Sequence, residues 1–240
     1  MPKAASVSVG STYSTSNGEC KVLRYEGAFK VKVKFQETGT IVWCRADHLR
    51  RGVVKDPLYP SVLGVGFLGI GEYSFKADYR AYKLWAAMLQ RCYTKSGRHS
   101  SYAGCRVVKS WHNFQTFAAW CVAQPNWNMP DFHLDKDLRV LGNKKYGPKY
   151  CSFVPAKVNT LFQIDTKTTG IKRKSSGRFV AFCKSFLTGY VVIGNYGTER
   201  EARSAYLKYK KKMIKRVADH FKNVLHIQVY TNLISWRIAA

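Results

Sequence analysis

The excess of positive charge constrains this chain more than any other feature of its sequence. Forty lysine and arginine residues stand against fourteen acidic residues, which gives a net charge of +26 over 240 positions. A compact fold tolerates this self-repulsion poorly unless a polyanion relieves it. Because nucleic acid is the commonest polyanion, we expect a protein that binds a phosphate backbone.

The length and composition favour several small domains over one large core. Hydrophobic residues make up 46% of the chain and aromatic residues 14%, which is typical of folded domains. The cysteines are scattered and never spaced as Cys-x-x-Cys, so we expect reduced thiols packed as small apolar groups rather than a zinc cluster or disulfides.

Two signals of membrane targeting are missing from the sequence. No run approaches the roughly 20 apolar residues that cross a bilayer, and the N-terminus lacks the apolar core of a secretory signal. We therefore expect no membrane partner and a cytoplasmic location.

Residues 1–72 predict a small basic β domain. Residues 29–35 alternate strictly, so that apolar side chains face one side and Lys30, Lys32 and Lys34 face the other. This period is typical of a half-buried strand in a small twisted sheet or barrel. The three lysines either contact phosphate or line a solvated face, and the sequence leaves both open.

A glycine-rich segment from Pro60 to Gly71 follows this domain. It contains a literal G-x-G-x-x-G that begins at Gly64. A dinucleotide-binding motif would require a βαβ context and an acidic residue about 20 positions further on, and neither is present. We expect a flexible boundary between domains instead.

Two amphipathic helices are expected after the glycines. Aromatic and sulfur-containing residues recur at helical spacing from Tyr82 to Cys92 and again from Phe114 to Cys121. Ser110 is a candidate cap for the second helix. We interpret the rings as core residues rather than platforms for base stacking.

A stretch in the middle of the chain predicts two strands and a helix. Residues 134–140 and 151–154 have strand character, and Gly142 and Asn143 turn the chain between them. Pro155 suits the first turn of a helix, because its missing N–H would have no partner there. Such a ββα arrangement can hold one divalent ion between strand and helix.

The ligands of this ion would be hard oxygen atoms. The first strand offers the carboxylate of Asp135, or that of Asp137 on the same side, and the helix offers the amide oxygen of Asn159. Such ligands suit Mg²⁺, which would stabilise a phosphate under attack and its leaving 3′ oxygen. His133 lies on the same strand face and is a candidate base for the attacking water, although an ordinary structural histidine also fits.

The middle of the chain resembles the HNH homing-endonuclease-like proteins of bacteriophages. The resemblance covers roughly residues 79–161 and depends on Tyr82, Trp85, Met88, Arg91, Cys92, Tyr93, Trp111, Phe114, Phe117, Leu134 to Asp137, Gly142 to Lys144, Tyr146, Pro148, Cys151, Phe153 to Pro155 and Asn159. It implies a ββα-metal nuclease module, one divalent cation (Mg²⁺, or another such as Mn²⁺) and hydrolysis of phosphodiester bonds in DNA.

The resemblance also implies roles for single residues. Asp135 takes the place of the metal ligand on the strand, Asn143 that of the asparagine that braces the loop, and Asn159 that of the helix ligand. Lys136 stands where the family usually has its general-base histidine, and a lysine would have to lose its proton to act as a base. This departure leaves His133 as a substitute base, or a family member that has lost catalysis.

Residues 168–217 resemble a second family, the APETALA/ethylene-response-factor type of DNA-binding domain. Two short alternating runs and a capping box at Thr198 and Glu201 already predict strands followed by one amphipathic helix. The resemblance rests on Gly177, Arg178, Phe179, Ala181, Ile193, Gly194, Tyr196, Thr198, Glu201, Ala202, Ala205 and Tyr206. It implies a three-stranded sheet in the major groove, with DNA contacts from Lys172, Arg173, Lys174, Arg178 and Lys184.

The sequence as a whole predicts an α+β protein. We expect a β domain at 1–72, an HNH-like ββα-metal module with flanking helices at 73–165, a three-stranded antiparallel sheet with one helix at 166–220, and a tail at 221–240. We expect a monomeric phage-type endonuclease that nicks or cleaves double-stranded DNA in the bacterial host, with Arg91 as a further candidate phosphate contact. The alternatives are a DNA-binding regulator derived from such a nuclease and, less favoured, an RNA-binding protein.

Overall fold

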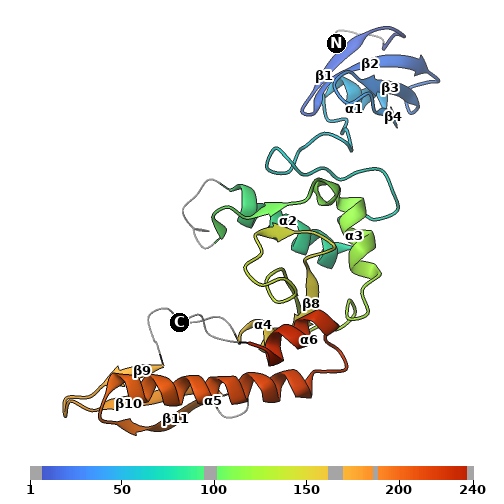
Figure 1. Ribbon diagram of the computed structural model, residues 1–240. Helices are drawn as coiled ribbons and strands as arrows, with labels where there is room; N and C mark the ends of the chain where they lie inside the picture. The colour runs from blue at the N-terminus through green and yellow to red at the C-terminus, as the bar shows by residue number, and fades with distance from the viewer. Residues whose placement is uncertain (1–6, 95–101, 162–169, 186–188, 237–240) are drawn as a thin grey trace. The chain divides into compact units, whose positions relative to one another are not determined.

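The computed structural model describes residues 7–94, 102–161, 170–185 and 189–236 (Figure 1). It is a mixed α+β structure with helices and several small sheets, as the sequence predicts. Contacts between Cα atoms divide the chain into two compact units, Met1–Cys121 and Val122–Ala240. The domain borders expected after residues 72 and 165 stay predictions. In the described part of the chain, no helix is both long enough and apolar enough to cross a membrane.

The first unit begins with a four-stranded antiparallel sheet. Its strands lie in chain order: β1 (Thr12–Thr15), β2 (Gly18–Tyr25), β3 (Val31–Phe35) and β4 (Ile41–Cys44). A short helix, α1 (Ala46–Arg50), follows. Val31, Val33 and Phe35 bury one face of β3 against Leu49 of α1, which confirms the alternation seen in the sequence.

Phe29 does not join that buried face. The strand begins only at Val31, because a turn precedes it in which the N–H of Lys30 donates to the carbonyl oxygen of Gly27. Gly27 has a φ of +113°, a conformation that L side chains rarely adopt. The Phe29 ring is left 74% exposed, with the guanidinium of Arg45 lying 4.7 Å from its centroid.

The rest of the first unit is mainly helical. It contains α2 (Tyr79–Tyr93), the short strand β5 (Arg106–Val107), the 3₁₀ turn η2 (Lys109–His112) and α3 (Phe114–Val122). Trp85, Met88, Phe114 and Phe117 are buried, so the core role predicted for this stripe is confirmed. Ser110 lies inside η2 and does not cap α3. Asn113 does so instead, since its Oδ1 atom accepts the N–H of Gln115 at 2.9 Å.

The glycine-rich segment packs onto these helices and is not the flexible boundary that its glycines suggested. A Cβ atom on Gly66 would lie 2.5 Å from the Leu89 side chain and 2.9 Å from that of Trp85. The side-chain amide of Gln115 donates to the carbonyl oxygens of Leu68 and Tyr73. Gly66 is therefore required for close approach to α2.

The second unit combines a small hairpin with a larger sheet. In the hairpin, β6 (Phe132–Asp135) pairs antiparallel with β8 (Ser152–Pro155), β7 (Lys145–Tyr146) lies between them in the chain, and α4 (Ala156–Asn159) follows. The larger sheet contains β9 (Ile171–Arg173), β10 (Phe179–Ser185) and β11 (Gly189–Tyr196) in the order β11-β10-β9. The long helix α5 (Glu199–His220) packs on this sheet, and α6 (Ile227–Ile234) packs on α5 (Figure 1).

One hydrophobic core joins the hairpin to the C-terminal helices. Val154 of β8 and Val158 of α4 share it with Ile214 of α5 and Val229 of α6. The tail expected at 221–240 therefore contributes α6 to the apolar core that supports the hairpin and α4.

The first hairpin strand is shorter than the expected run from 134 to 140. It ends at Asp135, whose Oδ1 atom accepts the backbone N–H groups of Asp137 at 2.9 Å and Leu138 at 2.7 Å. An aspartate that captures the N–H groups just after it turns the chain and withdraws those groups from the sheet.

The capping box at the start of α5 is formed as predicted. Thr198 Oγ1 accepts the N–H of Glu201 at 3.2 Å, and Glu201 Oε2 accepts the N–H of Thr198 at 3.0 Å. Replacing Thr198 by alanine is expected to lower the free energy of unfolding by about 1 kcal/mol, because it leaves a helix-terminal N–H without its partner. Urea unfolding followed by circular dichroism measures this loss. Thr198→Ser keeps the hydroxyl and should stay close to the wild type; an equal loss in both variants would contradict the explanation.

Candidate metal centre and nucleic-acid surfaces

The hairpin brings the two expected metal ligands onto neighbouring elements. In the β6–β8 register, His133 pairs with Val154 and Asp135 pairs with Ser152, while α4 contacts both strands. Asp135 is the last residue of β6 and Asn159 is the last residue of α4. Both side chains are partly buried.

The free ligand atoms of this pair are suited to a hard cation. The two backbone N–H groups hold only Oδ1 of Asp135, and in the described residues neither its Oδ2 atom nor the Asn159 side chain has a hydrogen-bond partner. Burial raises the pKa of Asp135, and the N–H donors of Leu138 and Asp137 oppose that shift. One carboxylate and one amide oxygen would fit Mg²⁺, which keeps several waters and accepts phosphate oxygens. The described residues hold no group of three or more His, Cys, Asp or Glu that could bind a metal.

The surroundings of Lys136 give its side chain a structural role rather than that of a general base. It is 7% exposed, and its ammonium group donates to the Asp137 carboxylate and, at 3.4 Å, to the carbonyl oxygen of Asn143. The same Nζ atom lies 5.8 Å from the centroid of the Tyr146 ring. The exposed Asp137 carboxylate is thus bound to Lys136. It also lies beyond the end of β6, so the strand alternation that would place it beside Asp135 does not apply.

Asn143 closes the loop between β6 and β7. Its Nδ2 atom donates to the carbonyl oxygens of Lys136 at 2.8 Å and Lys145 at 2.6 Å, and its Oδ1 atom accepts the N–H of Lys145 at 3.0 Å. This amide therefore holds both ends of the loop that carries Lys136. His133 is exposed on β6, two residues before Asp135 and on the same face by strand alternation.

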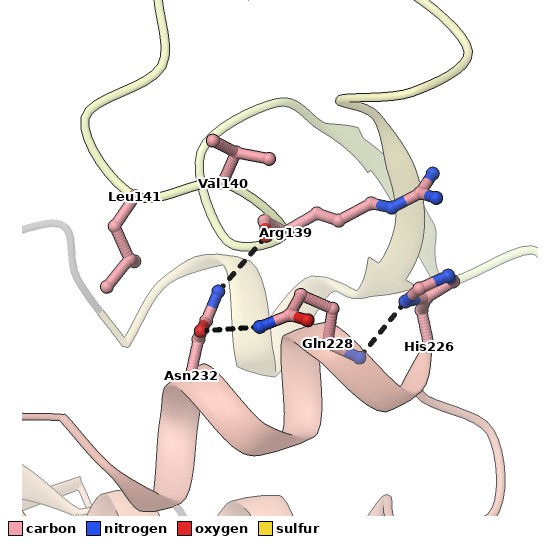
Figure 2. A pocket seen from close by; sticks show the side chains of 6 residues that line it. All are labelled: Arg139, Val140, Leu141, His226, Gln228 and Asn232. Carbon is pink, nitrogen blue, oxygen red and sulfur yellow. Dashed lines mark hydrogen bonds between the residues drawn. The ribbon is translucent and has the colours of Figure 1, made fainter.

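A pocket of about 460 Å³ lies where α6 meets the loop that follows Asp137 (Figure 2). Asn232 Nδ2 donates to the carbonyl oxygens of Leu138 at 2.9 Å and Arg139 at 3.1 Å, and its Oδ1 atom accepts from Gln228. His226 Nδ1 accepts the backbone N–H of Gln228. These polar groups form hydrogen bonds with one another. The contacts of Asn232 therefore hold the loop at Leu138 and Arg139 against α6. Sequence analysis missed Asn232, because its partners lie more than 90 positions earlier in the chain.

The basic residues expected to bind DNA lie on exposed parts of the larger sheet. Lys172, Arg173, Lys174 and Arg178 are exposed on β9 and on the turn to β10. Arg178 also donates to the carbonyl oxygen of Asn195, and Arg173 lies over the Phe179 ring. The side chain of Lys184 lies outside the described residues.

The lysines of the first unit and Arg91 lie on other elements. Lys32 and Lys34 project from β3 on the face opposite its buried residues, and Lys30 precedes the strand. Arg91 is partly buried near the end of α2, where its guanidinium lies 5.6 Å from the Tyr102 ring centroid. The structure therefore does not bring all candidate phosphate contacts onto one element.

Comparison of this chain with protein-family models, curated proteins and solved structures found no match in any of the three.

The raised pKa of Asp135 predicts a pH dependence that can be measured against a variant without this carboxyl group. The folded protein holds the Asp135 proton more tightly than the unfolded chain, so this contribution to stability is fully present below the ordinary pKa of 3.8 and is lost as the pH rises through the higher folded pKa. Relative to Asp135→Asn, the wild type should gain free energy of unfolding between about pH 7 and about pH 4. Urea unfolding of both proteins across this range tests the sign, and a constant difference between them would contradict it.

Proposed function

We propose that this chain is a metal-dependent DNA endonuclease of the HNH homing type, with β6, β8 and α4 as its ββα-metal module. One observation carries the proposal. The Asp135 carboxylate ends a hairpin strand beside the helix of Asn159, with Oδ1 held by two N–H groups and Oδ2 without a hydrogen bond in the described part of the chain. This is the arrangement expected of a carboxylate that is oriented for a ligand.

Asp135 and Asn159 would hold the ion, which would be Mg²⁺ or another divalent cation such as Mn²⁺. When bound, the ion supplies positive charge to the phosphate and to the leaving 3′ oxygen. His133, exposed on the same face of β6, would accept the proton of the attacking water. Lys136 and Asn143 would keep the adjoining loop in place through their hydrogen bonds.

The larger sheet would hold the duplex as an ethylene-response-factor-like domain. This assignment is supported by the exposure of the four basic residues Lys172, Arg173, Lys174 and Arg178 and by the net charge of +26. Contacts of this kind are mostly to phosphate, so duplex affinity should fall steeply as the salt concentration rises.

A second candidate function is a DNA-binding regulator without cleavage. The observation that favours it is Lys136, which occupies the position of the usual base and is buried in contact with Asp137 and Asn143. In this case the hairpin would serve only as a scaffold.

Incubation of the purified protein with supercoiled plasmid separates the two functions. The endonuclease should convert the plasmid to nicked or linear DNA in Mg²⁺ or Mn²⁺ and leave it intact in EDTA. A library of plasmids that carries phage and host sequences covers the unknown recognition site. Tight, salt-sensitive binding without strand breaks under either condition would overturn the nuclease and support the regulator.

A further inference from the structure

The outer face of the first sheet places like charges at opposite positions on neighbouring strands. Across the strands, Arg24 of β2 pairs directly with Lys32 of β3, and Lys21 of β2 pairs directly with Lys34 of β3. Like charges at directly opposite positions repel each other and destabilise an antiparallel sheet. The charge pattern of this face is therefore complementary to a ligand with several negative charges.

Exposed aromatic rings lie among these charges. Trp43 of β4 is the cross-strand neighbour of Lys32 and is 46% exposed, and Phe29, which precedes β3, is 74% exposed beside Arg45. The core of this sheet is formed on its other face by residues such as Val31, Val33 and Phe35. The rings are therefore not needed to fill the core and present their surfaces to solvent.

Cations are held close to the rings. The Nζ atoms of Lys30 and Lys32 lie 5.0 and 5.6 Å from the Trp43 ring centroid. Glu26 forms ion pairs with Arg24 and Lys30, both at 2.6 Å, and so fixes these two cations at one end of the sheet. Lysine ammonium groups and a flat ring are thus available within a few ångströms of one another.

We propose that this stacking face, formed by Arg24, Phe29, Lys30, Lys32, Trp43 and Arg45, binds a single, unpaired strand of DNA. The bases would stack on Trp43 and Phe29, and the cations would contact the intervening phosphates. Proteins that bind single strands combine aromatic platforms with a basic groove in this way. In a duplex the base faces are already stacked on one another, so exposed rings would gain little from paired DNA. This binding does not require the hydrolysis proposed above.

Affinity measurements on the full-length protein in EDTA test the proposal. Fluorescence anisotropy compares a labelled oligothymidine of about 20 nucleotides with a duplex of the same length at one salt concentration. Trp43→Ala is expected to weaken single-strand binding by about 5- to 150-fold, since stacking contributes about 1–3 kcal/mol per base. Duplex affinity should change by less than about 2-fold, because duplex binding does not use the ring.

Ile41→Ala is the matched control. Ile41 projects from the same face of β4, two residues from Trp43, and is 48% exposed but has no ring. It should leave both affinities unchanged, and Trp43→Phe should restore most of the single-strand affinity. The proposal is overturned if Trp43→Ala leaves single-strand affinity intact, or if it weakens single-strand and duplex binding by the same factor. Because EDTA is present throughout, a failure of the metal centre would not alter these results.

Discussion

Asp135→Asn is expected to reduce metal-dependent DNA nicking by about 100- to 1000-fold, with the fold retained. The magnitude follows from the several kcal/mol of charge stabilisation that a bound metal supplies, since each 1.36 kcal/mol is a factor of ten in rate. The substitution replaces a charged oxygen ligand by a neutral group that binds Mg²⁺ more weakly.

The fold should persist because asparagine keeps the Oδ1 acceptor. The backbone N–H groups of Asp137 and Leu138 can therefore still donate to this side chain and end β6 at the same place. Removing the partly buried negative charge should not lower the stability of the fold, because burial disfavours the charged form and raises the pKa of Asp135.

Asp131→Asn provides the matched control. Asp131 is exposed just before β6, so its substitution makes the same change in net charge outside the candidate metal centre. Plasmid nicking rates and duplex affinities should be measured for both variants. Loss of nicking only in Asp135→Asn, with unchanged duplex affinity, supports the metal centre. Nicking by Asp135→Asn at the wild-type rate would refute the assignment of this carboxylate.

Trp85→Ala is expected to destabilise the first unit by about 3–5 kcal/mol, the typical cost of emptying a buried aromatic site. Trp85 is 0% exposed, and its ring lies 5.5 Å from that of Phe114 and 5.9 Å from that of Tyr82. Its indole N–H donates to the carbonyl oxygen of Trp111 at 2.8 Å. The truncation therefore opens a cavity and leaves a buried carbonyl group without this donor.

Guanidinium unfolding followed by circular dichroism measures the loss. Because the chain has two compact units, the transition should be fitted separately for each unit where two steps are seen. Trp43→Ala is the control, since it removes the same side chain from an exposed position and should cost less than about 1 kcal/mol. Equal losses in the two variants would show that Trp85 does not have the core role assigned to it.

Several elements could be predicted because their signals are local. The alternation around β3, the helical stripe that includes Trp85 and the capping box of Thr198 each depend on residues within a few positions of one another. Asp135 and Asn159 could be identified as a candidate pair because the intervening strands and turn have clear local patterns. The site residues expected from the two family resemblances stay predictions.

Other features depend on contacts between distant residues. The glycines near Gly66 predict a flexible boundary, because glycine frees the backbone. In the structure, Gly66 instead allows the backbone to approach Leu89 and Trp85. Lys136 was considered only as a replacement for a base, because its contacts with the Asn143 loop depend on how that loop closes. A strand pattern also could not show that Asp135 would end β6 by accepting the next two N–H groups.

The order of residues was sufficient to establish a basic α+β chain, with strands and helices whose apolar faces repeat at regular intervals. Periodicity and charge are properties of neighbouring residues, and they do not depend on contacts with distant parts of the chain. Only the tertiary structure determines which atoms surround each polar group. A carboxylate, an ammonium group or an amide acquires its role from the atoms that surround it, and packing brings those atoms together from remote positions.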